Sequence, residues 1–173
     1  NPAYLLDVLV TVFEKAPEVE VHFYGHLNDC ADLFKHHLRK YPKNVFVHGL
    51  VSREAASEAL DKADILINIA NRTRHQLPSK LVDYMASGKP ILNIVSIVDD
   101  NSASFLSSYP ITATVMENSD GVKKDDVEKI NEFIKKSTVV PKHTIEVLLE
   151  PFQVPALESQ YRKLFKAKEI SGK

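Results

Sequence analysis

The sequence predicts an α/β domain built on a Rossmann-like, doubly wound parallel sheet with helices on both faces. Short apolar runs of strand length alternate along the chain with amphipathic segments of about ten residues, a pattern typical of parallel βαβ units. The chain has 173 residues, of which 44% are hydrophobic and 26% charged, enough to bury the core of one domain. We assign residues 1–150 to this domain and residues 151–173 to a closing helix.

The first half of the chain predicts helices and strands in alternation. Leu5, Leu9 and Phe13 recur at helical spacing, and the run 19–25 alternates and then stops at a glycine, as strands do. Ser52 is placed to cap the third helix. The expected helices cover residues 3–15, 31–39 and 53–62, and the expected strands cover residues 19–25 and 44–49.

The second half continues this alternation. Ile65–Ile69 and Ile91–Val95 are apolar runs of strand length. Between them Pro78 suits the first turn of a helix, where its missing N–H would have no partner, and Gly88 is placed to end that helix. Residues 99–110 are rich in Asp, Ser and Asn and predict a looser region. Beyond it we expect a strand over 112–116, a helix over 124–136, a proline-containing connecting arm over 137–156 and the closing helix over 156–168.

The stretch between the two apolar runs predicts a site for an anion. A polar loop with three basic residues, Arg72, Arg74 and His75, follows the first run and leads into the N-terminus of the helix. Helix N-termini offer unpaired N–H groups and the positive end of a dipole, so the anion we expect is a phosphate. Ligands of doubly wound folds bind beyond the carboxyl ends of the strands. The loops expected to border the site are 25–29, 48–52, 70–79 and 96–103.

The segment Pro78–Ile91 has the sequence Pro-Ser-Lys-Leu-Val-Asp-Tyr-Met-Ala-Ser-Gly-Lys-Pro-Ile. It resembles the nucleotide-sugar-binding segment of the group 1 family of retaining GT-B glycosyltransferases, whose members have roughly PSKLFEYMASGKPVI here. The resemblance implies a parent enzyme that moves a sugar from a nucleotide-sugar, such as a UDP- or GDP-sugar, to a sugar or lipid-linked acceptor in surface polysaccharide assembly. Such enzymes stabilise the leaving diphosphate without a metal, so no cofactor is expected.

The resemblance places the donor diphosphate at the start of the helix. Ser79 and Lys80 open the helix and would contact the diphosphate through backbone amides, a hydroxyl and an ammonium. Arg72 and Arg74 would add charge from the loop. The simpler alternatives are that Ser79 only caps the helix and that the two arginines are solvated.

Two further roles follow from the resemblance. Asp83 aligns with the second acid of the family's paired-glutamate signature, from which it departs by being one methylene shorter. That acid binds the ribose hydroxyls of the donor, a task suited to a carboxylate because it accepts hydrogen bonds from two adjacent hydroxyls. His75 stands where the family has a glutamate near the transferred sugar, and it is the catalytic candidate. An exposed helix acid and an exposed loop histidine are the alternatives.

The loops after the first two strands are expected near the nucleobase, again by resemblance. Gly25 and His26 end the first of these strands, and His48 and Gly49 end the second. Glycine at a strand end is equally an ordinary turn residue.

The resemblance also implies that the chain is most of the C-terminal half of such an enzyme without its first strand. That strand precedes the first helix in the family and lies at the middle of the sheet, and the N-terminal half binds the acceptor. In the strand order 3-2-1-4-5-6, its loss leaves the strand at Val19 facing the strand at Ile65. We expect the two to pair directly, or a filler such as Thr144–Leu149 or a second copy of the chain to occupy the slot.

Composition excludes several classes of function. The net charge of -1 does not suit a nucleic-acid-binding protein, and the lone Cys30 indicates a reducing compartment. Neither a signal peptide nor an apolar run of membrane-spanning length is present, so we expect a cytoplasmic domain, with the inner face of the membrane as an alternative. The basic segment Lys35–Lys40 is either a solvated face or a weak contact with anionic lipid. His22 with His26, or His36 with His37, lack further ligands for a metal.

Two other functions stay open. One is a binding module that holds a nucleotide or a protein without chemistry, which the departures at His75 and Asp83 favour. The other is a GT-B-like sugar-nucleotide epimerase, against which the Pro-Ser-Lys and Gly-Lys-Pro sequences argue. Transferase activity of the intact parent would exclude the first, and a product assay would separate the second.

Overall fold

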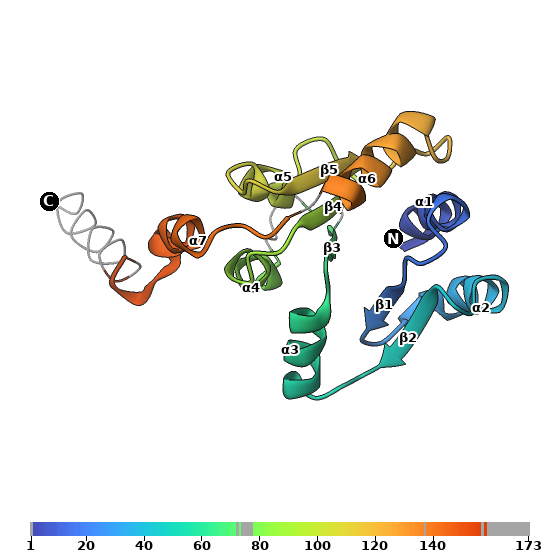
Figure 1. Cartoon of the computed structure of the whole chain (residues 1–173), viewed down its shortest axis with the longest axis horizontal. Coiled ribbons are helices and arrows are strands. Elements are labelled where there is room, and N and C mark those ends of the chain that lie inside the picture. The colour runs from blue at the N-terminus through green and yellow to red at the C-terminus, as the bar shows by residue number, and fades with distance from the viewer. Residues whose placement is uncertain (1, 72, 74–77, 137, 157, 159–173) are drawn as a thin grey trace, which may run out of the picture.

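The computed structural model describes residues 2–71, 73, 78–136, 138–156 and 158. It is an α/β fold in which helices and strands alternate along the chain (Figure 1). The strands are β1 (Val21–Tyr24), β2 (Val45–Gly49), β3 (Leu66–Ile69), β4 (Ile91–Val95) and β5 (Thr112–Met116). The helices are α1 (Pro2–Lys15), α2 (Ala31–Lys40), α3 (Arg53–Lys62), α4 (Lys80–Ala86), α5 (Asn101–Leu106), α6 (Lys124–Lys136) and α7 (Lys142–Leu149), with short 3₁₀ turns at Asn28–Cys30 and Glu150–Phe152.

The described strands form two parallel sheets. β1 pairs with β2, and β3, β4 and β5 pair in that order. In the larger sheet Asn68 lies level with Asn93, which lies level with Thr114. Parallel sheets flanked by helices confirm the predicted fold class.

The predicted direct pairing of β1 with β3 is wrong, whereas closure by a second copy of the chain stays a prediction. These strands are the edges of separate sheets, and no described strand lies between them. The candidate filler Thr144–Leu149 lies within helix α7 instead. Apolar side chains of α1 and α6 form one cluster with those of both sheets, so the two sheets are joined through this core and not through strand pairing.

Helix α1 supplies the core that the two sheets share. Its buried face is apolar and belongs to one continuous cluster with side chains of both sheets and of α6. The members of this face are Tyr4, Leu5, Val8, Leu9, Val12 and Phe13, none more than 5% exposed. The Tyr4 hydroxyl also donates a hydrogen bond to Asp126 of α6, 2.7 Å away. One helix therefore connects elements that share no backbone hydrogen bonds.

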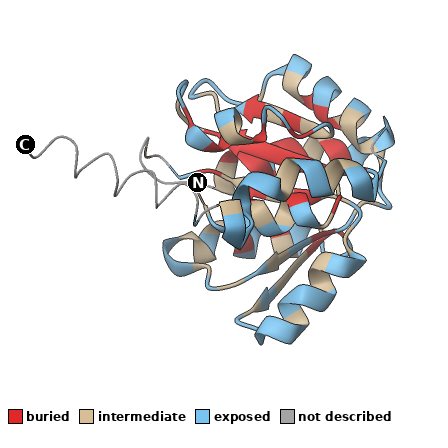
Figure 2. Ribbon diagram, turned by 90° about the vertical axis from the view of Figure 1, so that its left-hand side faces the viewer, coloured by how far each residue is buried: buried red, intermediate tan, exposed pale blue. Residues whose placement is uncertain are grey.

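Helices α4, α5 and α7 cover the opposite side of the larger sheet. Leu81 and Met85 of α4 pack with Ile91 of β4 and Leu106 of α5, and Ile145 of α7 adds to this second cluster. Buried residues accordingly gather on the strands and on the inward faces of the helices (Figure 2). The larger sheet thus has helices on both faces, as predicted.

Several local predictions hold and others need correction. The Ser52 hydroxyl accepts the backbone N–H of Ala55 and caps α3, as expected. The region 99–110 is not loose: Asp100 accepts the N–H of Ser102 and starts α5. Prediction failed there because Asp and Ser are typical of loops and of helix caps alike.

The expected arm and the start of α4 also differ from the prediction. Residues 137–156 contain helix α7, which begins directly after Pro141, because proline is tolerated at a helix start. Pro78 lies ahead of α4 and not in its first turn, and its carbonyl accepts the N–H of Leu81. The closing helix expected over 156–168 falls largely outside the described residues, and the boundary between residues 150 and 151 stays a prediction.

If α1 joins the two sheets, Leu5→Ala should destabilise both together. Leu5 is fully buried, and a buried leucine replaced by alanine costs about 2–5 kcal/mol. Urea unfolding measures this cost, and amide hydrogen exchange locates it. We expect faster exchange in β1 and β2 as well as in β3, β4 and β5.

The exposed Asp7 on the same helix provides the control, and Asp7→Ala should leave stability nearly unchanged. Faster exchange confined to one sheet in Leu5→Ala would show that α1 does not join them.

Candidate functional site

The candidate site is defined by the carboxyl ends of parallel strands, where ligands of α/β folds bind. The loops after β1 and β2 lie at this edge of the smaller sheet, and those after β3 and β4 lie at this edge of the larger one. Helix α4 follows β3 and returns to β4, so its first turn lies near the carboxyl edge.

The start of α4 presents two exposed predicted site residues. Ser79 occupies the N-cap position, and its hydroxyl makes no capping hydrogen bond. The ammonium of Lys80 lies 5.8 Å from the centre of the Tyr84 ring. Lys80 has an exposed surface, yet the protein atoms around its ammonium displace enough water to lower its pKa. Because the Ser79 hydroxyl makes no capping hydrogen bond, the structure does not show the capping role that was the alternative for Ser79.

Asp83 lies one turn further along α4 and is exposed. The structure thus brings Ser79, Lys80 and Asp83 together on one short helix. Arg72, Arg74 and His75 lie outside the described residues, so the basic loop and the catalytic candidate stay predictions.

The two predicted nucleobase loops are in contact. The N–H of Gly25 donates to the carbonyl of Gly49, 2.7 Å away. Both glycines have positive φ, +121° and +70°, and the space where a Cβ would stand is open at each. His26 is exposed, whereas His48 lies on β2 and its ring is stacked on Tyr24.

A row of four rings crosses β1 and β2 next to these loops. His48 stacks between Tyr24 and His22, with ring centres 4.4 and 5.2 Å away, and His22 stacks on Phe46. Nδ1 of His22 lies 2.9 Å from Nε2 of His48, so the imidazoles share one hydrogen-bonding proton. Glu20 lies 3.2 Å from the other nitrogen of His22. Within the described parts of the chain, no three His, Cys, Asp or Glu side chains are placed to hold a metal ion.

The Gly-Lys-Pro turn after α4 is hydrogen-bonded to the end of α3, to Tyr109 and to Val140. The ammonium of Lys89 donates to the carbonyls of Asp61 and Ala63 at the end of α3. The hydroxyl of Tyr109 donates to the carbonyl of Lys89, 2.8 Å away, and burial raises the pKa of Tyr109 to about 12. Gly88 has φ +72° and packs against α7, and its carbonyl accepts the N–H of Val140.

A buried polar cluster beneath the carboxyl edge was not predicted. Asn68 and Asn93 are both fully buried and lie level on adjacent strands. Each interrupts an apolar strand, Ile-Leu-Ile-Asn-Ile and Ile-Leu-Asn-Ile-Val. An asparagine inside such a run was the signal that could have revealed them, because buried polar groups need partners.

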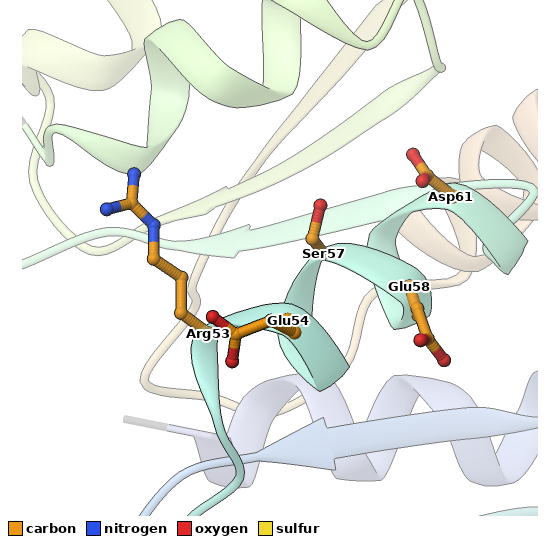
Figure 3. Close-up of a pocket in the computed structure, with 5 residues that line it drawn as sticks. All are labelled: Arg53, Glu54, Ser57, Glu58 and Asp61. Carbon is orange, nitrogen blue, oxygen red and sulfur yellow. The ribbon is translucent and has the colours of Figure 1, made fainter.

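A hollow of about 400 Å³ lies elsewhere and does not mark a site. Its lining residues all come from helix α3, as Figure 3 shows: Arg53, Glu54, Ser57, Glu58 and Asp61. Side chains of one exposed helix face do not converge from several elements on a ligand, as those of a binding pocket do.

Solved structures that are similar to the chain include the following two. One belongs to the GtfA/B complex, with a TM-score of 0.67 and 15% identity over 95% of this chain and 32% of that one. The other is AviGT4, a glycosyltransferase involved in avilamycin A biosynthesis, with a TM-score of 0.68 and 11% identity over 99% of this chain and 48% of that one. No protein-family model and no curated sequence matches. The chain shares its fold with a glycosyltransferase and spans less than half of either structure's length.

The packing of Gly88 predicts a steric cost for any side chain there. A Cβ would lie 2.6 Å from Cδ1 of Ile145, in a backbone conformation that alanine disfavours. We expect Gly88→Ala to lower the free energy of unfolding by about 2–4 kcal/mol, the sum of a left-handed backbone and an overpacked contact. Urea unfolding measures it.

Two companion variants separate these causes. Gly121 also has positive φ but open space around it, so Gly121→Ala should show the backbone cost alone. Ile145→Val removes Cδ1 and should restore part of the loss in a double-mutant cycle. Gly88→Ala no worse than Gly121→Ala, or no coupling to Ile145→Val, would contradict the contact.

Proposed function

We propose that the chain is the donor-binding domain of a glycosyltransferase that transfers a sugar from a nucleotide-sugar to an acceptor. The observation that carries this proposal is the position of the Pro78–Ile91 segment. It leads from the carboxyl edge of β3 through α4 to β4, in a fold shared with a glycosyltransferase. In α/β folds this is where a nucleotide binds.

In this proposal the donor lies across the start of α4. Ser79 and Lys80 bind the diphosphate, helped by Arg72 and Arg74, and Asp83 accepts hydrogen bonds from the ribose. Donors and positive charge that are already in place stabilise the negative charge that develops on the leaving diphosphate. The lowered pKa of Lys80 supports this role, because an ammonium that has lost some of its water binds an anion more strongly.

The remaining parts of the site follow the same proposal. His75 contacts the transferred sugar, and the loops at Gly25 and Gly49 border the nucleobase. The contact between these glycines supports this, because it brings the two loops together, and no heavy atom lies within 4 Å of a Cβ position at either glycine. The sugar or lipid-linked acceptor is bound by another part of the full-length enzyme, and the product enters a surface polysaccharide at the inner face of the membrane. No described helix is both long and apolar enough to cross a bilayer.

A binding module without transferase activity is the second candidate. It is favoured by one observation, the departure of His75 and Asp83 from the paired glutamates of the family. Hydrolysis or transfer of a labelled nucleotide-sugar by the full-length protein distinguishes the two, since only an enzyme releases the sugar.

The proposed site predicts that UDP or GDP binds the 173-residue chain and that Asp83→Ala weakens the binding. We expect at least about a tenfold loss, the scale of hydrogen bonds to a charged group. Calorimetric titration of each nucleotide measures affinity. Asp125→Ala on α6 is a matched control, because Asp125 is also an exposed helical aspartate but lies on the opposite side of the sheet.

Equal affinities for the Asp83→Ala and Asp125→Ala variants would make Asp83 an ordinary surface acid. No binding of either nucleotide at millimolar concentration would contradict the proposed donor site as a whole.

A further inference from the structure

The buried polar cluster joins three strands and the start of α5. We call it the amide cluster and define it by its members: Asn68 on β3, Asn93 on β4, Thr114 on β5, and Asp100 and Ser102 at α5. The two asparagines are 0% exposed, Ser102 1% and Asp100 4%. Polar side chains inside a protein destabilise it unless their hydrogen bonds are satisfied, so the direction of each bond matters.

A single proton on Ser102 decides that direction. The Ser102 hydroxyl lies within hydrogen-bonding distance of Oδ1 of Asp100 and 3.1 Å from the amide of Asn93. A hydroxyl has one hydrogen and can donate to only one of them, and an ionised carboxylate can only accept. The hydrogen therefore points to Asp100, which also accepts the N–H of Ser102 at 2.8 Å.

Asn93 must then present its nitrogen to Ser102. An amide can be turned about its last bond with almost no change of shape, so its partners decide which atom is oxygen. The nitrogen of Asn93 then faces both Ser102 and Asn68. Because the facing amide atoms of Asn68 and Asn93 are 2.7 Å apart, the atom of Asn68 in this contact must be its oxygen, which accepts. The oxygen of Asn93 then faces the Thr114 hydroxyl, 3.5 Å away, which can donate.

This arrangement changes the identity of an unpaired atom. The second amide atom of Asn68 is buried without a hydrogen-bond partner, and in the turned amide it is a nitrogen. The opposite arrangement keeps an oxygen there but requires a proton on Asp100, so that Ser102 is free to donate to Asn93. The same oxygen of Asp100, Oδ1, accepts the backbone N–H of Ser102 and faces its hydroxyl, and a carboxyl oxygen that carries a hydrogen is the poorer acceptor.

We propose that Asn93 donates to both Asn68 and Ser102, and that it is a positioning residue for residues 70–71 and 96–100, the described starts of the two loops that border the donor site. Asn68 lies just before the end of β3, where the loop to α4 begins, and Asp100 ends the loop after β4. The cluster links these loops through side chains alone. Its positioning role rests on the proposed function, whereas the direction of its bonds does not.

The variants Asn68→Asp and Asn93→Asp form a matched pair that tests the direction. The two positions are level on adjacent strands and equally buried, and each gains one carboxyl. At Asn68 a new carboxyl still accepts from Asn93. At Asn93 a carboxyl replaces the NH₂ group whose two hydrogens are donated to Asn68 and Ser102. Even a protonated carboxyl has only one hydrogen to donate to these two partners.

We therefore expect a lower urea midpoint for Asn93→Asp than for Asn68→Asp. Equal midpoints, or the reverse order, would overturn the direction. If Asn93→Asp fails to fold while Asn68→Asp folds, the expected order holds. If neither folds, NMR of the wild-type chain decides instead: the side-chain NH₂ hydrogens of Asn93 show NOE contacts to Ser102 if Asn93 donates to Ser102, and to Thr114 if it does not.

Backbone NMR signals and nucleotide titration test the positioning role. Ser102→Ala should shift the signals of Ala70 and Asn71 as well as those of α5, and should weaken the binding of UDP or GDP several-fold. Ser104→Ala, an exposed serine on the same helix, should shift only its neighbours. Shifts confined to α5 would overturn the positioning role, whereas a wild-type chain that binds neither nucleotide would contradict the proposed function and leave the test of bond direction intact.

Discussion

The packing of α1 is the interaction on which the rest of the structure depends. Within the described part of the chain the two parallel sheets are not paired, yet apolar side chains of both belong to the same buried cluster as this one helix. Each fully buried leucine or valine contributes about 1.5–3 kcal/mol by leaving water. The relative position of the loops at Gly25 and Gly49 on one sheet, and of the start of α4 on the other, is therefore set by side-chain packing. A donor that contacts both sheets would depend on that packing as well.

Around the larger sheet, hydrogen bonds between polar groups fix the positions of elements that the apolar core brings together. Lys89 and Tyr109 fasten the turn after α4 to the end of α3 and to the second apolar cluster. The amide cluster joins the ends of β3 and β4 beneath the loops. Such groups contribute little net stability but fix geometry, because each has few satisfactory partners. Ser79, Lys80 and Asp83 thus lie on a short helix whose following turn is hydrogen-bonded to the end of α3 and to Tyr109, and whose buried face packs in the second apolar cluster.

Much of this fold could be predicted from the sequence, because apolar runs, glycine stops and caps act locally. Ile65–Ile69, Ile91–Val95 and the Ser52 cap are examples. The predictions that failed concerned features set by long-range packing, or residues that are typical of more than one local structure. Asp100 and the serines that follow it are typical of a loop as well as of a helix start. Pro141 suggests an irregular segment, although helix α7 begins directly after it and is stabilised by its contacts with α4. No local pattern shows that α1 keeps β1 and β3 apart. At the site, the position of Ser79, Lys80 and Asp83 follows from α4, whereas the pairing of Asn68 with Asn93 needs the register of the strands.

A crystal structure of the chain with GDP or UDP would test whether a nucleoside diphosphate binds at the carboxyl edge of the larger sheet, at the start of α4. We expect the diphosphate beside Ser79 and Lys80 and the ribose within hydrogen-bonding distance of Asp83. Nucleotide density at the hollow on α3, or on the row of rings across β1 and β2 with the start of α4 empty, would contradict this expectation.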